Sequence, residues 1–84
     1  MIQPMGVRVD LTIDAGYVTY ANGTVAETIE VWEEGRVAAD VDHDDRVIGI
    51  EVLGLDPETL DHARSFATSR GLAFPAHLEG VASA

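Results

Sequence analysis

The sequence contains no cysteine, so neither a disulfide framework nor a thiolate zinc site is available to it. It also lacks lysine: the five basic residues are all arginines and face 15 acidic residues, which gives a net charge of -10. This charge repels nucleic-acid phosphates and anionic lipids, so we expect no nucleic-acid and no membrane partner. The same field attracts a basic protein, although it can also serve only to keep a small domain dissolved.

No apolar run is long enough to span a bilayer, and Met1–Pro4 has neither the basic segment nor the apolar run of a signal peptide. We therefore expect a cytoplasmic protein. The length of 84 residues and the 46% apolar content predict one small domain over residues 1–84. A sheet with one layer of helix is the natural limit for a chain of this size.

Short alternating segments between turn residues predict an α+β fold. We expect an antiparallel meander of four to five β-strands over about 5–53, followed by one C-terminal α-helix over about 57–70 that packs on one face. Asn22-Gly23 is typical of a type I′ turn and predicts a hairpin between Tyr17–Tyr20 and Val25–Val31. In that hairpin Val18 lies opposite Glu27.

The later turns set a register that keeps apolar residues on one face. A three-residue loop at Glu33-Glu34-Gly35 predicts these pairs: Trp32 with Arg36, Val31 with Val37, and Ile29 with Ala39. The acidic turn Asp42–Asp45 predicts these: Val41 with Ile48, Ala39 with Ile50, and Val37 with Val52. Before them, Val7, Val9, Leu11 and Ile13 alternate with polar residues, which indicates a first strand that runs to Ile13.

The helix has clear start and stop signals. Asp56 is a strong N-cap, Pro57 suits the first helical position, and Gly71 suits the C′ position. The predicted buried stripe consists of Leu60, Ala63, Phe66 and Ala67. After the helix, Leu72-Ala73-Phe74 can dock on the sheet, and we expect residues 75–84 to be loosely ordered.

Three stretches resemble a small prokaryotic family catalogued as domain of unknown function 2283: Asp14-Ala15-Gly16-Tyr17-Val18-Thr19-Tyr20, Val25-Ala26-Glu27-Thr28, and Asp42 to Glu51. The resemblance covers about half the chain, from Asp10 to Leu53. Two positions depart from the family pattern: Asp45 replaces the usual turn glycine, and Leu11 replaces a proline. The family has no established activity. Some members look like partners of small toxins, which implies an acidic inhibitor of a basic toxin as one possible role.

Two acidic features can carry chemistry or structure. Asp40, Asp42, Asp44 and Asp45 surround His43 and can bind a divalent cation, but the spacing of an EF-hand loop is absent and turn formation explains the same residues. Glu27 falls on the apolar face of the predicted sheet. It is either an acid or base with a raised pKa, or an edge residue that reaches solvent or pairs with an arginine such as Arg64.

The predicted partner-binding residues are Trp32, Arg36, Glu30 and Glu33. We place Trp32 on the outer face of the sheet beside Arg36, with both glutamates near. An exposed tryptophan next to an arginine suggests an interface anchor, and a cross-strand cation–π pair is the alternative. Together with Val47 and Leu53, Trp32 can make the uncovered face of the sheet adhesive.

No metal-ligand spacing, nucleophile motif or phosphate loop is present, so we predict no catalytic residues, metal or cofactor. The sequence therefore favours a non-enzymatic acidic protein-binding module that associates with itself through the open face or edge around Trp32, a homodimer being possible. Two alternatives stay open. One is an antitoxin-like inhibitor of a basic toxin, and the other is a small metal-dependent domain that uses Glu27, Glu51 and the acidic turn.

Overall fold

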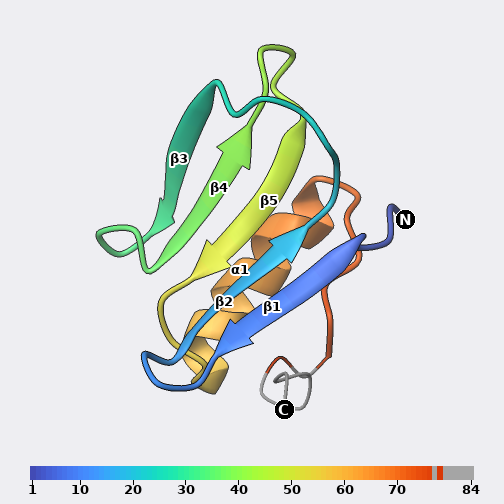
Figure 1. Cartoon of the computed structure of the whole chain (residues 1–84). Coiled ribbons are helices and arrows are strands. Elements are labelled where there is room, and N and C mark those ends of the chain that lie inside the picture. The colour runs from blue at the N-terminus through green and yellow to red at the C-terminus, as the bar shows by residue number, and fades with distance from the viewer. Residues whose placement is uncertain (77, 79–84) are drawn as a thin grey trace.

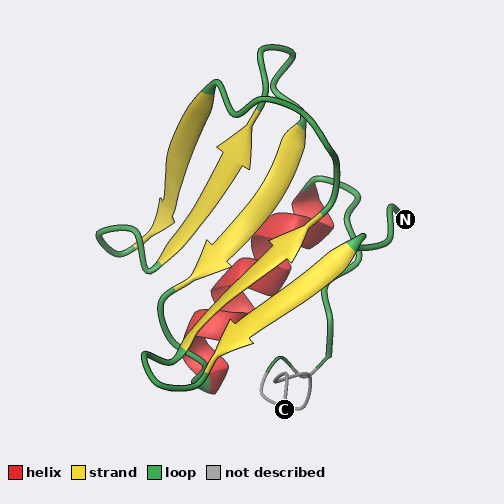
Figure 2. Cartoon of the chain, in the orientation of Figure 1, coloured by secondary structure: helices red, strands yellow, loops and turns green. Residues whose placement is uncertain are grey.

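The computed structural model describes residues 1–76 and residue 78. Within them the chain forms five strands and one helix (Figure 1, Figure 2). The elements are β1 (Gly6–Asp10), β2 (Ala15–Thr19), β3 (Glu27–Trp32), β4 (Val37–Val41), β5 (Val47–Val52) and α1 (Pro57–Ser69). All strand pairs are antiparallel, and α1 packs against β3, β4 and β5. The α+β fold with a C-terminal helix is as predicted.

The strand order is β1-β2-β5-β4-β3, so the sheet is not one continuous meander. The hairpin predicted at Asn22-Gly23 is wrong, because β2 pairs with β1 and β5 and not with β3. The connection from β2 to β3 instead arches over the end of the sheet (Figure 1). In the observed register Val18 lies opposite Ile50, and both side chains are fully buried. The predicted hairpin set Val18 against Glu27, whose carboxylate remains exposed here.

Two bulges alter the register of the β3–β4–β5 meander. Ile29 lies opposite Ala39, as predicted, but a bulge between Glu30 and Trp32 sets Trp32, and not Val31, opposite Val37. The turn after β3 spans four residues, since the Arg36 N–H donates to the Glu33 carbonyl over 3.0 Å.

Between β4 and β5 the predicted pairs of Ala39 with Ile50 and of Val37 with Val52 are confirmed. A second bulge, between Asp40 and Val41, replaces the predicted Val41–Ile48 pair by Val41 with Val47. The extra residue keeps Val47 in the core while the pairing slips by one position.

β1 ends at Asp10, earlier than predicted. The Asp10 carboxylate accepts hydrogen bonds from the backbone N–H and the hydroxyl of Thr12, and this turns the chain. Leu11 and Ile13 therefore lie exposed in the turn, and the reversal is complete at Asp14, whose φ is 49°.

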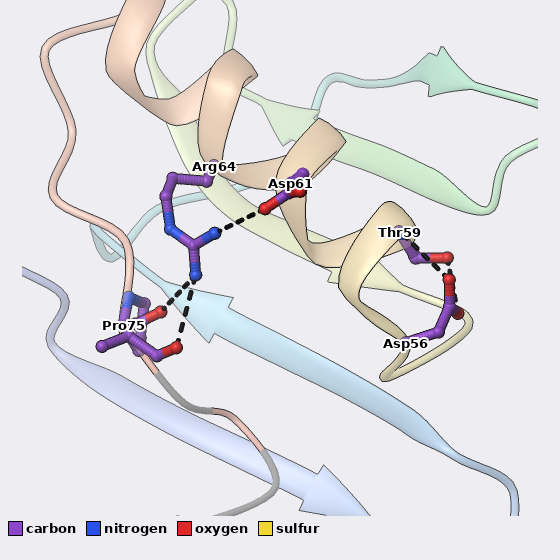
Figure 3. Close-up of polar contacts among 6 residues, drawn as sticks. Asp56, Thr59, Asp61, Arg64 and Pro75 are labelled. Carbon is purple, nitrogen blue, oxygen red and sulfur yellow. Dashed lines mark hydrogen bonds and ion pairs between the residues drawn. The ribbon is translucent and has the colours of Figure 1, made fainter.

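The core lies between the sheet and α1. Its buried members are Val18, Tyr20, Val37, Val41, Val47, Ile50, Val52, Leu60, Ala63, Ala67, Leu72 and Leu78. The predicted stripe of the helix is buried except for Phe66, which is half-buried. The predicted cap is present: Asp56 accepts the Thr59 N–H over 3.1 Å and the Thr59 hydroxyl over 2.8 Å (Figure 3). Gly71 follows the helix with φ 73°.

The segment after α1 turns back on the side of β1 (Figure 1) and docks as predicted for Leu72–Phe74. Leu72 is buried and forms a parallel bridge with Ile2, and the Tyr20 hydroxyl donates to the Ala73 carbonyl over 2.7 Å. Arg64, which pairs with Asp61 over 3.0 Å, donates to the carbonyls of Pro75 and Ala76, each over 3.4 Å (Figure 3).

Leu78 falls in the segment that we expected to be loosely ordered, yet its side chain is fully buried. It packs against β2, since its Cδ1 lies 3.2 Å from the position that a Cβ at Gly16 would take. A leucine isolated between polar and small residues has no periodicity, so the sequence pattern gave no sign of it. The same expectation for residues 77 and 79–84 lies outside the described residues.

We expect Leu78→Ala to lower the free energy of unfolding by about 3 kcal/mol, because the change removes a fully buried side chain and leaves a cavity beneath β2. Urea unfolding of both proteins measures the difference. Leu53→Ala is the control: Leu53 is 48% exposed, and its truncation is expected to cost much less. Equal effects of the two changes would contradict the placement of Leu78.

Candidate functional site

The face of the sheet opposite α1, here called the open face, is left uncovered by the described residues. Its side chains form two rows across all five strands. The first row is Arg8, Tyr17, Glu51, Ala38 and Glu30. The second row is Gly6, Thr19, Gly49, Asp40 and Thr28. This face is therefore predominantly polar, whereas the face towards α1 carries the core.

A hydrogen-bonded group of three side chains spans the centre of the open face. The Tyr17 hydroxyl donates to Asp40 Oδ2 over 2.7 Å, and the Thr28 hydroxyl donates to Asp40 Oδ1 over 2.6 Å. These bonds connect β2, β4 and β3 across β5. Both oxygens of Asp40 thus have partners, which fixes the carboxylate in place.

Gly49 makes room for this group. A Cβ at Gly49 would lie 2.1 Å from the Tyr17 hydroxyl oxygen and 2.3 Å from the ring carbon that bears it. The tyrosine ring therefore lies directly over β5 at the position where any other residue would place a side chain. A glycine inside a strand often marks such a close approach.

The environment holds Tyr17 in its protonated form. Desolvation raises the pKa of its hydroxyl well above the ordinary value of 10, and the hydrogen bond to Asp40 and the charges of Asp40 and Glu51 raise it further. At neutral pH the phenol is a hydrogen-bond donor to Asp40. It is therefore unsuited to act as a nucleophile or a base.

The open face is acidic. Glu30, Asp40 and Glu51 lie on it, and Arg8 is the arginine that shares their rows. The other four arginines of the chain are engaged elsewhere. Their partners are the carboxylates of Asp56 for Arg36, Asp42 for Arg46 and Asp61 for Arg64, and the ring of Phe66 for Arg70.

Trp32 does not lie on the open face, and this placement was wrong. The bulge before it turns its side chain towards α1, where its ring stacks on His62 with a centroid distance of 4.1 Å and an interplanar angle of 12°. Trp32 is half-buried and packs against the core. It is therefore not the exposed anchor that the sequence suggested. Val47, predicted to make the open face adhesive, is buried in the core.

Of the other three predicted partner-binding residues, two lie in the turn that follows Trp32 and one lies on the open face. Arg36 lies in the turn after β3, with Nη1 4.0 Å from Asp56 Oδ1. Glu33 is in the same turn with φ 40°, while Glu30 is on the open face and accepts the Glu34 N–H over 3.1 Å. Of the four, Glu30 belongs to the site described here.

The acidic turn is held together by hydrogen bonds to Asp42. Its carboxylate accepts the N–H groups of Asp44 and Arg46, each over 2.9 Å, and the Arg46 Nε over 3.0 Å. The backbone hydrogen bond from Arg46 is the main cause that lowers the pKa of Asp42. Asp45, which departs from the family glycine, adopts φ 63°. Within residues 1–76 and 78, no group of three or more histidine, aspartate or glutamate side chains is placed to hold a metal ion.

Glu27 lies at the start of the edge strand β3, opposite Val41, and is exposed. Its position matches the edge interpretation of the sequence. The suggested pairing with Arg64 does not form, because Arg64 pairs with Asp61.

Tyr17 and Gly49 are site residues that the motifs of the sequence do not predict, and Asp40 is predicted only as part of the acidic cluster around His43. One signal was present: Gly49 interrupts a strand of large apolar residues, between Ile48 and Ile50. Its meaning depends on β2 lying beside β5, which no local pattern indicated.

The fold and this face define a small α+β protein with a five-stranded antiparallel sheet, a helix on one side and an acidic polar surface on the other. Residues 7–55 match the family described as "Protein of unknown function (DUF2283)", and since they are more than half of the chain, the protein belongs to this family. The match covers the sheet from Val7 onward and ends before α1. No curated protein and no solved structure matches the chain. No helix of the described residues is long and apolar enough to cross a membrane.

The two tyrosines of the chain give a prediction about alkaline pH. Burial raises the pKa of Tyr20 to about 12, and the pKa of Tyr17 is also raised. The unfolded-state pKa is about 10, so the protonated phenols stabilise the fold fully below that pH. This contribution is lost as the pH rises through the folded-state values. We expect absorbance titration of the folded protein to show no phenol that ionises near pH 10. In the Tyr17→Phe variant, the ionisation of Tyr20 should be the one tyrosine transition that remains.

A second prediction concerns Gly49. We expect Gly49→Ala to lower the free energy of unfolding by about 2 kcal/mol, because its methyl group displaces the Tyr17 ring and breaks the bond to Asp40. Gly6→Ala is the matched control, since a Cβ at Gly6 meets nothing within 4 Å. Adding Tyr17→Ala to Gly49→Ala removes the clash, so the two changes together should cost less than the sum of their separate costs. Additive costs in urea unfolding would count against this packing.

Proposed function

We propose that this protein is a non-enzymatic binding module that captures a cationic segment of a partner protein on the open face of its sheet. The observation that carries the proposal is the charge of that face, where Glu30, Asp40 and Glu51 lie in two rows with Arg8. The net charge of -10 extends the attraction beyond the contact surface and accelerates encounter with a basic partner.

The geometry of the face supports a binding role. Its carboxylates project from paired strands, and Asp40 is held by hydroxyl groups from β2 and β3. In Asp40, a lysine or arginine side chain that binds there meets an acceptor whose position is already fixed, so less conformational entropy is lost on association. Because the Tyr17 hydroxyl is held protonated as a donor to Asp40, it is not available as a general base, which favours binding over catalysis.

An antitoxin-like inhibitor of a basic toxin is a specific form of this function, since the toxin would be the cationic partner. The resemblance of the chain to its family suggested that role, and the charge of the open face is compatible with it. The metal-dependent alternative has less support, because the Asp42 carboxylate is already occupied by Arg46 and the turn backbone.

A lysine- and arginine-rich peptide tests the proposal. We expect the peptide to shift the backbone NMR resonances of Tyr17, Glu51 and Glu30 more than those of α1, and its affinity to fall as salt rises. Removing two face charges with Glu30→Gln and Glu51→Gln should weaken binding by about 5- to 30-fold.

The control variant combines Glu27→Gln and Glu58→Gln, which removes the same charge from outside the open face. Glu27 pairs with Val41, whose side chain points towards α1, and Glu58 lies in the first turn of α1. An equal loss of affinity in the two variants would mean that the peptide responds only to total charge, and the proposed face would be rejected.

A further inference from the structure

The sheet ends in two edge strands that differ in their protection. β3 is interrupted by a bulge and carries Glu27 and Glu30, devices that discourage pairing with another strand. β1 pairs with β2 over five consecutive residues without a register shift, and no strand of the described residues lies on its other side. β1 is therefore the edge on which a further strand can be added.

Exposed apolar side chains flank this edge strand at both of its ends. Of the seven large apolar side chains that are exposed in the described residues, five lie within residues 1–13: Met1, Ile2, Met5, Leu11 and Ile13. Single exposed apolar residues need no explanation, but a concentration beside an unpaired strand indicates a contact surface. A hollow of about 520 Å³ also opens here, lined by Arg8, Val9, Asp10 and Leu11 from this edge and by residues of β2 and β5.

We propose that β1 pairs antiparallel with β1 of a second copy of this chain, about a two-fold axis at Val9, to form a continuous ten-stranded sheet. The occupant is a second copy because the strand is complementary to itself in both charge and apolarity. The inference does not depend on the proposed function, since it uses the sheet edge and not the open face.

The register follows from which way the side chains face. Val7 and Val9 pack towards the core, while Arg8 lies on the open face opposite Tyr17. In an antiparallel pair, residues that lie opposite one another point their side chains to the same face of the sheet. Val9 can therefore lie opposite Val7, Val9 or another residue that points towards the core, but not opposite Arg8. The two central registers therefore place the two-fold axis either at Arg8 or at Val9.

Charge selects between these registers. An axis at Arg8 sets Arg8 directly against Arg8 of the second copy, and like charges in that position are destabilising. An axis at Val9 sets Arg8 against Asp10 on both sides of the axis and Val9 against Val9, and it brings the turn that carries Leu11 next to Val7 of the second copy. The second register pairs opposite charges and covers the exposed side chain of Leu11.

The distribution of charge over the whole molecule favours the same edge. Each chain carries a net charge of -10, so two copies repel one another over most of their surfaces. On β1 the arginine and the aspartate balance. The resulting dimer has both helices on one side of the sheet and both open faces on the other, because paired residues share their facing.

Sedimentation velocity over a range of protein concentrations, with light scattering after size-exclusion chromatography, tests the inference. We expect a species of twice the 9.0 kDa chain mass. Arg8→Asp places like charges opposite each other at both symmetric positions and should weaken the dimer about tenfold or more. Asp10→Arg should do the same, and the two changes together should restore the dimer, because they exchange the charges and leave the pairing intact.

Leu11→Ser and Leu53→Ser form a matched pair, since these side chains are 55% and 48% exposed. Only Leu11→Ser should weaken the dimer. Asp10→Arg loses the hydrogen bonds to Thr12 and can therefore fail to fold, which circular dichroism would detect. In that case Arg8→Asp and the leucine pair still test the inference. A wild-type chain that stays monomeric overturns the inference. So does a dimer that Arg8→Asp and Leu11→Ser leave intact.

Discussion

The insertion of β2 beside β5 is the constraint on which the rest of the structure depends. On the side of α1 it sets Val18 against Ile50, two fully buried side chains at the centre of the sheet. On the open face the same pairing lays Tyr17 over Gly49, so that its hydroxyl reaches Asp40. A change in strand order would remove both the central core contact and the polar group opposite it. Stability and candidate function thus share one strand pairing.

Local signals predicted the elements well and the long-range pairing poorly. The predictions that depend on residues close in sequence were correct: the N-cap at Asp56, the C′ glycine at Gly71 and the strand pairs around Ala39. The Asn22-Gly23 hairpin failed although its local signal was strong. Of these two residues only Gly23 has a positive φ, whereas a type I′ turn needs it at both positions. Burial of Val18 against Ile50 decided the strand order, and that gain cannot be read from a turn.

The site was harder to predict than the fold because a single inserted residue reverses the facing of the residues that follow it in the same strand. The bulge before Trp32 directs its ring onto His62 and away from the expected outer face. The basis for predicting an exposed tryptophan anchor is thereby lost. Of the predicted partner-binding residues, Glu30 lies on the open face. The position of the Tyr17 hydroxyl and the space above Gly49 follow only from the three-dimensional structure. Bulges depend on competition between strand packing and turn geometry, which a regular alternation does not encode.

The two edges of the sheet limit how the protein can associate. An open sheet with two pairing-competent edges can add copies without end, as in a fibre, whereas one competent edge gives a closed pair. Here β3 carries a bulge and two glutamates, and β1 carries a balanced Arg8 and Asp10. Two-fold pairing through β1 consumes the competent edge of both copies and leaves only acidic, irregular edges at the ends. The same negative charge that would attract a cationic partner to the open face then opposes further growth of the sheet.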